Sequence, residues 1–195
     1  MRVLAFVDVH NNQKALQDIK KKAVISDIVV CAGDISIFEN KLDYMVEQLS
    51  KIKKTVLIIH GNHETKEKLE TACKNFPNLV FLHEKCYTFN STIFFGYGGG
   101  GFSLTDTRLE KVTKSVLRKI SNNKLVLITH APPYGTKLDI VLNQHCGNKT
   151  LTEIIKRLNP TLVITGHFHE NAGVSDRINK TKVVNPGPHG KIITI

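Results

Sequence analysis

The sequence predicts an α/β fold, a four-layered α/β/β/α sandwich in which two mixed sheets pack face to face and helices flank them. Short apolar runs alternate with longer amphipathic segments, a pattern typical of buried strands joined by helices. A denser group of β-type runs lies in the middle of the chain, and further β-type runs lie near both ends. The 195 residues, 41% of them hydrophobic and 23% charged, fit one globular domain over residues 1–195.

The alternating part of the chain predicts five strands and five helices. The strands are the short apolar runs Val3–Val7, Ile28–Cys31, Val56–Ile59, Leu125–Thr129 and Leu162–Thr165. The helices are the amphipathic segments Asn12–Lys22, Phe38–Ser50, Thr65–Lys74, Thr105–Ile120 and Lys149–Leu158. Each predicted strand except the fifth is followed along the chain by one of these helices.

The remaining β-type runs complete the two sheets. In the middle of the chain, Asn90-Ser91 favours a turn and predicts a meander or hairpin over Val80–Leu82, Tyr87–Phe89 and Thr92–Gly96. Near the carboxyl end, a segment rich in proline and glycine divides two more runs, Lys182–Val184 and Lys191–Ile195. Strands at both ends of the chain that enclose the α/β units favour two sheets over one.

The composition restricts the classes of protein to which the chain can belong. No apolar run approaches the roughly 18 residues of a membrane span, and the first run ends at Asp8, so we expect a cytoplasmic protein without membrane contact. Four cysteines occur singly, at positions 31, 73, 86 and 146, and favour inert thiols over a zinc knuckle or disulfides. The net charge of +10 suits nucleic acid, but lysines near helix ends are also ordinary partners of the helix dipole. The oligomeric state stays open.

Polar side chains follow every one of the five alternating strands. They are Asp8 and His10, Asp34, Asn62 and His63, His130, and His167 with His169. Because the carboxyl ends of parallel strands form the ligand crevice of an open sheet, these side chains are expected to converge. Singly, each has an ordinary explanation as a helix cap or a turn residue, but five strand ends together favour a metal site.

The donor types narrow the choice of metal. Carboxylate, imidazole and amide oxygen without thiolate suit Mn²⁺, Fe, Zn²⁺, Co²⁺ or Ni²⁺. One transition ion takes about four to six ligands, fewer than the side chains available here. Two divalent ions that share one carboxylate are therefore the economical prediction.

The motifs Asp8-Val9-His10, Gly33-Asp34, Gly61-Asn62-His63-Glu64, Thr129-His130 and Gly166-His167-Phe168-His169 resemble, in order, those of the calcineurin-like metallophosphoesterases. His130–Asp139 and His145-Cys146-Gly147 are similar to the small bacterial and archaeal phosphoesterases of that superfamily. The resemblance implies the α/β/β/α fold, two metal ions with Mn²⁺ preferred, and a small phosphate-ester substrate.

Carried over by position, the resemblance implies a role for each site residue. One ion is assigned to Asp8, His10, Asp34 and His169, and the other to Asp34, Asn62, His130 and His167. Asp34 bridges the two ions, and His63 is the general acid or stabilises the transition state. Two ions roughly 3.5–4 Å apart can generate a bridging hydroxide as the nucleophile, and a neutral-range imidazole can protonate the leaving oxygen.

The remaining histidines and the glycine run receive no catalytic role. His83 is interpreted as an exposed structural residue, and His60, His145 and His189 match no metal motif. Gly98–Gly101 lacks the lysine of a phosphate-binding P-loop and is interpreted as a segment that allows close backbone approach.

The predicted function is hydrolysis of phosphate esters, with phosphodiesters preferred. The alternatives are a phosphomonoesterase, a nuclease acting on nucleic acid, or a catalytically silent scaffold that binds proteins. The presence of all five motif histidines favours an enzyme over a scaffold, and the short chain leaves little extra surface for a polymer.

Overall fold

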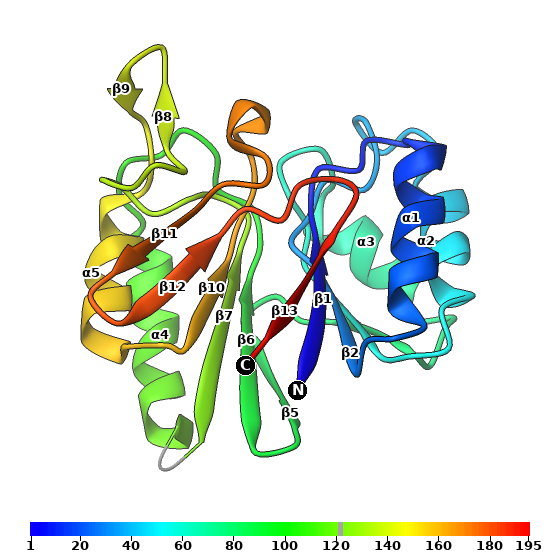
Figure 1. Cartoon of the computed structure of the whole chain (residues 1–195), viewed down its shortest axis with the longest axis horizontal. Helices are drawn as coiled ribbons and strands as arrows, with labels where there is room; N and C mark the ends of the chain where they lie inside the picture. Colours follow the sequence, from blue (N-terminus) through cyan, green and yellow to red (C-terminus); the bar gives the residue numbers. More distant parts are fainter. Residues whose placement is uncertain (121–122) are drawn as a thin grey trace.

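The computed structural model describes residues 1–120 and 123–195, except for the side chains of residues 115–120. Two large sheets form its centre (Figure 1). The first sheet has the strand order β13-β1-β2-β3-β4, with strands Lys191–Thr194, Arg2–Phe6, Ile28–Cys31, Val56–Ile58 and Leu79–Phe81. The second has the order β11-β12-β10-β7-β6-β5, with strands Ser175–Ile178, Thr181–Val184, Leu162–Ile164, Lys124–Thr129, Thr92–Tyr97 and Lys85–Phe89.

Both sheets are mixed, as predicted. In the first, β1 to β4 run parallel and β13 pairs antiparallel with β1. In the second, the central strands β12, β10, β7 and β6 run parallel, while β11 and β5 are antiparallel at the edges. The parallel strands place their carboxyl ends together along one edge of each sheet, which is where the predicted site residues begin.

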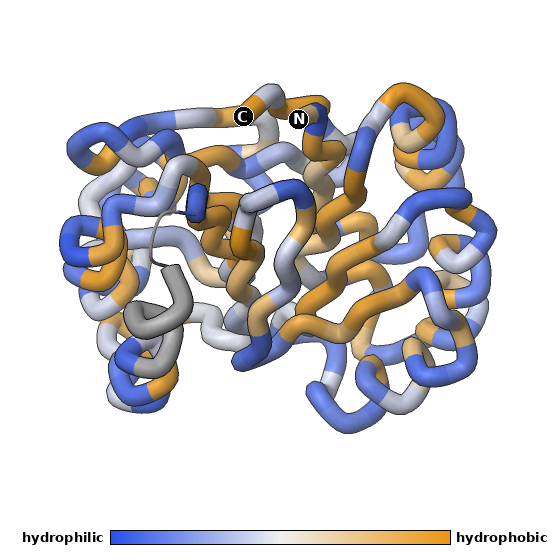
Figure 2. Tube along the Cα trace, turned by 90° about the horizontal axis from the view of Figure 1, so that it is seen from below, coloured by the Kyte–Doolittle hydropathy of each residue, from blue (hydrophilic) through white to orange (hydrophobic). Residues whose placement is uncertain are grey.

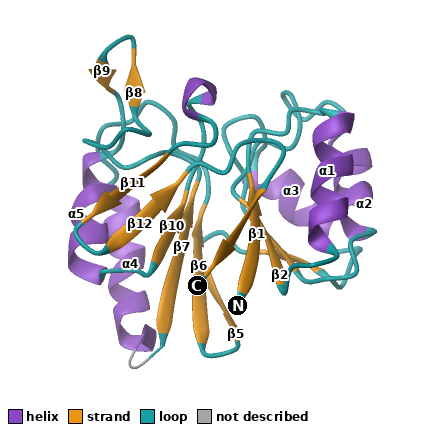
Figure 3. Ribbon diagram, viewed as in Figure 1, coloured by secondary structure: helices purple, strands orange, loops and turns teal. Residues whose placement is uncertain are grey.

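Helices cover the outer face of each sheet (Figures 1 and 3). Helices α1 (Gln13–Ala23), α2 (Leu42–Ser50) and α3 (Lys66–Cys73) lie on the first sheet. Helices α4 (Thr107–Ile120) and α5 (Lys149–Leu158) lie on the second. The predicted α/β/β/α layering is therefore confirmed.

Alternation along the strands explains why the sheets stack. In β1, Leu4 and Phe6 pack against the helices of the first sheet, whereas Val3 and Ala5 join the core between the two sheets. Strands buried on both faces carry apolar residues at every position, since successive side chains point to opposite faces. Figure 2 shows this distribution, with hydrophobic segments concentrated in the central strands and hydrophilic ones at the periphery.

The structure differs from the prediction at three places. Helix α2 begins at Leu42 and not at Phe38, because Phe38, Glu39 and Lys41 have positive φ and form a tight turn. The middle β region is not one meander, since β4 belongs to the first sheet and only β5 and β6 form the hairpin. Residues 140–145 form a small hairpin, β8 (Ile140–Val141) and β9 (Gln144–His145), that the sequence did not predict.

The described residues also bear on the expectations from composition. Cys31 and Cys73 are buried, Cys146 is half-buried, and no disulfide joins cysteines of the described chain. Within residues 1–120 and 123–195, no helix combines the length and the apolar character that a bilayer span requires.

Candidate metal centre

The eight predicted site residues lie on loops that follow the carboxyl ends of five strands. Asp8 and His10 follow β1, Asp34 follows β2, and Asn62 and His63 follow β3 of the first sheet. The second sheet contributes His130 after β7, and His167 with His169 after β10. The site thus forms where the same edges of the two sheets meet.

Asp34 lies at the centre of the site. Its Oδ2 atom is 3.2 Å from Nε2 of His130, 3.9 Å from Nε2 of His10 and 4.0 Å from Nε2 of His63. Its other oxygen, Oδ1, accepts the backbone N–H of His63 at 2.9 Å. Asp34 is 1% exposed, so its carboxylate is held between imidazoles of both sheets in a largely dry environment.

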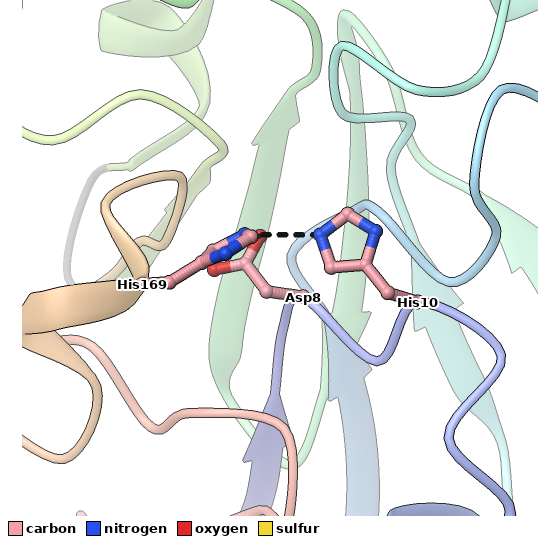
Figure 4. Close-up of side chains that lie close together, drawn as sticks. All are labelled: Asp8, His10 and His169. Carbon is pink, nitrogen blue, oxygen red and sulfur yellow. Dashed lines mark hydrogen bonds and ion pairs between the residues drawn. The ribbon is translucent and has the colours of Figure 1, made fainter.

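Asp8, His10 and His169 form one group of converging donors (Figure 4). Nε2 of His10 and Nε2 of His169 lie 3.0 Å apart, although the two residues come from different sheets. Oδ1 of Asp8 lies 4.0 Å from Nε2 of His169. The other ring nitrogen of His10, Nδ1, lies 3.1 Å from the carbonyl oxygen of Ser36, which fixes the ring with Nε2 toward the site.

Asn62, His130 and His167 form a second group on the other side of Asp34. Oδ1 of Asn62 lies 2.9 Å from Nε2 of His130 and 2.9 Å from Nδ1 of His167. Nδ1 of His130 lies 2.9 Å from the carbonyl oxygen of Ala32, which orients this fully buried ring. A backbone carbonyl on the outer nitrogen is the usual arrangement of a histidine that binds metal.

Two buried atoms of the site test whether the donors fit metal ions. Oδ1 of Asp8 and Nε2 of His167 are buried and have no hydrogen-bond partner among the described residues. A buried polar atom without a partner costs about 1–3 kcal/mol. Divalent ions within reach of these atoms would remove that cost, so the donor set fits such ions.

The site residues adopt strained backbone conformations. Asp8, His10, Asp34 and His167 have φ values of 55°, 44°, 54° and 74°. Residues other than glycine rarely occupy this left-handed region, and each instance costs about 1–3 kcal/mol. Strain at four positions of one site is typical of side chains whose direction is set by function.

Two glycines allow the strand ends to approach one another. A Cβ atom on Gly61 would lie 1.9 Å from Oδ1 of Asp34, and one on Gly166 would lie 2.1 Å from Cγ2 of Val7. Any larger residue would push the β3 loop away from Asp34, or the β10 loop away from β1. These glycines are therefore required for the packing of the site itself.

Asp34 and His130 perturb each other strongly. Burial alone would raise the pKa of Asp34, but the hydrogen bond and charge of His130 outweigh it and lower that pKa to about 2. Burial would likewise lower the pKa of His130, but the hydrogen bond and charge of Asp34 raise it to about 9. The site without metal therefore contains a buried ion pair at neutral pH.

Burial is the largest cause of the pKa shifts of Asp8, His10 and His167. It raises the pKa of Asp8 to about 6, and it lowers the pKa of His167 to about 4 with help from the charge of His130. Burial also lowers the pKa of His10. The imidazoles of His167 and His10 are therefore neutral near pH 7, the form that binds metal.

Glu64 is a site residue to which sequence reasoning gave no role, although it belongs to a quoted motif. Its Oε2 accepts the backbone N–H groups of Asp34 and Gly61 at 3.0 and 3.3 Å. Its Oε1 accepts the N–H and the hydroxyl of Ser36, both at 2.8 Å. This buried carboxylate ties the β2 loop to the β3 loop and so positions Asp34 relative to Asn62.

The other histidines lie outside the donor groups. The prediction that His83 is exposed is wrong: its side chain is only 10% exposed, and its Nδ1 accepts the N–H of Gly98 at 2.9 Å. His60 packs against His83 with ring centroids 4.6 Å apart. His145 and His189 pair with Asp139 and Asp18, each at 2.8 Å.

Comparison with known proteins places this site in context. The chain is 30% identical over 201 residues to the uncharacterized protein MJ1162 of Methanocaldococcus jannaschii. The aligned region covers 96% of this chain and 88% of that protein. Its fold is similar to that of TT1561 of Thermus thermophilus, with a TM-score of 0.78 at 17% identity over 95% of this chain and 88% of that one. An archaeal protein described as a novel phosphodiesterase has a TM-score of 0.56 at 15% identity, over 96% and 84% of the two chains.

A family model gives the assignment directly. The model of the calcineurin-like phosphoesterases matches residues 1–171, a range that includes all eight predicted site residues. On that match, the chain belongs to the calcineurin-like phosphoesterase family.

Proposed function

We propose that the chain is a binuclear metal-dependent phosphodiesterase, with Mn²⁺ as the preferred metal. The observation that carries the proposal is the convergence of donors from five strand ends around the buried carboxylate of Asp34, which lies within 4.0 Å of His10, His63 and His130. One ion is assigned to Asp8, His10, Asp34 and His169. The second is assigned to Asp34, Asn62, His130 and His167.

When bound, the two ions would activate water for attack on phosphorus and neutralise charge on the phosphoryl oxygens. The protein's own contribution is to hold the donors in place before the ester arrives. Glu64, the strained loops and the outer carbonyl contacts of His10 and His130 all serve this positioning. Preorganised donors need no rearrangement during the reaction.

His63 is assigned as the residue that stabilises the leaving oxygen, because its hydrogen bond with Phe38 sets which ring nitrogen can donate. The backbone N–H of Phe38 donates to Nδ1 of His63 at 3.3 Å, so Nδ1 is unprotonated and Nε2 carries the proton. Nε2 faces Asp34, 4.0 Å from Oδ2. When the ester P–O bond breaks, its electron pair leaves on the ester oxygen, which accepts a hydrogen bond from Nε2–H while the negative charge develops and then takes a proton from solvent.

The exposure of the donors supports a diester as the substrate. The side chain of His169 is 59% exposed and that of His63 is 20% exposed, so one side of the site opens to solvent. A diester has two organic groups that need this room. It also carries one negative charge, so that it binds two cations less tightly than a dianionic monoester does.

The positions of the lysines favour a small ester over a nucleic-acid polymer. Lys20, Lys51, Lys53 and Lys54 line a surface pocket where α1 and α2 end. The strands that follow these helices begin there, so this pocket lies at the edge of the first sheet opposite the site. These four positive charges are therefore remote from the reacting phosphate.

The substrate class is tested by a direct comparison. With Mn²⁺ as the added metal, we expect a higher kcat/KM for bis(4-nitrophenyl) phosphate than for 4-nitrophenyl phosphate. Repeating the measurement with Zn²⁺, Co²⁺ and Ni²⁺ separates metal preference from substrate preference. A consistent preference for the monoester with every metal contradicts the assignment as a phosphodiesterase.

The role of His63 is tested by its dependence on the leaving group. We expect His63→Ala to retain metal and to lose about 10²–10³-fold in turnover for an alkoxide leaving group. The loss is smaller for 4-nitrophenolate, which leaves with less charge on its oxygen. An equal loss for both leaving groups contradicts stabilisation of the leaving oxygen.

A further inference from the structure

Two exposed phenylalanines flank the candidate metal centre. Phe38 is 76% exposed and Phe102 is 73% exposed. The Phe38 ring centroid is 4.3 Å from that of His63, and the Phe102 centroid is 4.9 Å from that of His167. Each phenyl ring is therefore separated from the centre by a single imidazole.

The two rings reach the centre from different sheets and through different histidines. Phe38 precedes α2 in the first half of the chain and contacts His63, which faces Asp34 from the β3 loop. Phe102 follows β6 of the second sheet and contacts His167, which faces Asn62. A phosphate held at the centre would have one aromatic ring beyond His63 and the other beyond His167.

Phe38 is held rigidly although its ring is exposed. Its φ of 47° is a conformation that bulky residues rarely adopt. The turn is fixed by hydrogen bonds from Asn40 N–H to Ile37 O at 2.9 Å and from Glu39 N–H to His63 O at 3.0 Å. The Glu39 side chain in turn accepts the N–H of Thr65 at 2.9 Å. Strain held in place next to a site is typical of a functional position.

Phe102 is presented by the glycine run, which is anchored on both sides. Gly99 N–H donates to His60 O at 2.9 Å, and a Cβ on Gly100 would lie 3.0 Å from Cβ of Ala131. Beyond the ring, Lys149 N–H donates to Leu104 O at 2.7 Å. The run thus allows the close approach that the sequence indicated, and it places Phe102 against His167.

Packing does not explain these rings. A phenyl ring contributes about 1.5–3 kcal/mol to stability when it is fully buried, and both of these rings leave about three-quarters of their surface in water. Single exposed apolar residues are common on proteins. Two rings that lie on hydrogen-bonded loops and each contact an imidazole of the same site are a more specific arrangement.

We infer that Phe38 and Phe102 bind the two organic groups of the substrate, and that these groups carry flat aromatic rings such as nucleobases. The inference rests on the proposed phosphodiesterase function. Phe38 stacks on the leaving group, because it contacts His63, the residue proposed to stabilise the leaving oxygen. Phe102 stacks on the group that stays on phosphorus. Nucleobases stack on aromatic side chains regardless of base identity, so the substrate class is nucleoside phosphodiesters.

Three substrates distinguish the contribution of Phe38 from that of Phe102. Thymidine 5′-(4-nitrophenyl phosphate) carries a flat group on each side, methyl 4-nitrophenyl phosphate only on the leaving side, and thymidine 5′-(S-ethyl phosphorothiolate) only on the retained side. We expect Phe102→Ala to lower kcat/KM roughly 5- to 100-fold for both thymidine esters and less than about 2-fold for the methyl ester. We expect Phe38→Ala to lower it by a similar factor for both nitrophenyl esters only.

Two further variants guard the interpretation. Phe→Leu at either position keeps an apolar side chain but removes the flat ring, and should lose most of the same selectivity. Val24→Ala shortens an apolar side chain of similar exposure, 75%, at the end of α1. It should leave kcat/KM unchanged for all three substrates.

The outcomes distinguish failure of the inference from failure of the proposed function. A Phe variant that lowers kcat/KM equally for all three substrates, or for none, overturns the inference, because the ring then only supports its histidine or does nothing. If the wild type hydrolyses no diester of the set, the proposed function itself is wrong.

Discussion

Glu64 provides a test of how the first sheet positions the site. Its two oxygens accept four hydrogen bonds, from the N–H groups of Asp34, Gly61 and Ser36 and from the Ser36 hydroxyl. Glu64→Gln replaces one of the oxygens by an NH₂ group, which accepts no hydrogen bond. The two buried groups that donated to that oxygen then face the NH₂ group and have no acceptor. If they are the N–H and the hydroxyl of Ser36, the hydroxyl can rotate away.

The expected cost follows from these contacts. Each buried donor without an acceptor costs about 1–3 kcal/mol, so the two donors should lower the free energy of unfolding of Glu64→Gln by about 2–6 kcal/mol. Burial and the charge of Asp34 raise the pKa of Glu64, so loss of its charge offsets part of the cost and favours the lower end of the range. The side chain is 4% exposed, which leaves little water to replace the lost acceptor.

The assay is urea unfolding of the metal-free protein at pH 7, followed by circular dichroism. Glu67→Gln is the matched control, since Glu67 is exposed in the first turn of α3 and should change stability little. A Glu64→Gln protein within about 0.5 kcal/mol of wild type would refute the reasoning, because it would mean that the two loops hold their positions without this carboxylate.

Three further predictions concern the metals, pH and thiols. Asp34→Asn should lose at least one of two bound ions in metal analysis; unchanged occupancy and affinity would rule out the bridging role. Burial first, then the charge of His83, lowers the pKa of His60 to about 4, so this imidazole is neutral when folded but takes a proton below about 6.5 when unfolded. The metal-free protein should therefore lose stability as the pH falls from about 6.5 to about 4, and His60→Phe should reduce that loss by up to about 3 kcal/mol. If urea unfolding shows that the free energy of unfolding falls equally with pH in both proteins, the prediction is contradicted. Burial raises the pKa of Cys31 and brings that of Cys73 to about 12, so iodoacetamide should leave both unmodified in the native protein, as mass spectrometry of the digested protein can check.

The sequence predicts the layers of the fold well because the strands are buried on both faces. Val29, Val30 and Cys31 of β2 are all fully buried, so a continuous apolar run identifies the strand. The prediction fails where tertiary contacts override local pattern. Strand β11 reads Ser-Asp-Arg-Ile, a polar edge strand that is held by its pairing with β12.

The metal-ligand side chains of the candidate site could be predicted because they come directly after the predicted strands. The convergence of Asp8, Asp34 and His130 requires that parallel strands share an edge and that the same edges of the two sheets meet. The roles of Glu64, Phe38 and Phe102 depend on partners far away in the chain, and neither periodicity nor spacing reports them. Phe38 was assigned to a helix because apolar spacing extends through it, whereas the hydrogen bond to His63 holds it in a turn.

The division of the donors between two sheets makes the site a link between separate parts of the fold. Asp8 and His10 come early in the chain, and their neighbour His169 lies more than 150 residues later. Ions that bind donors of both sheets bind the assembled sandwich in preference to either sheet alone, so their binding energy becomes resistance to unfolding. At a free concentration of 1,000 times the dissociation constant, one such ion contributes about 4 kcal/mol. Depletion of metal would then shorten the lifetime of the folded protein as well as stop its chemistry.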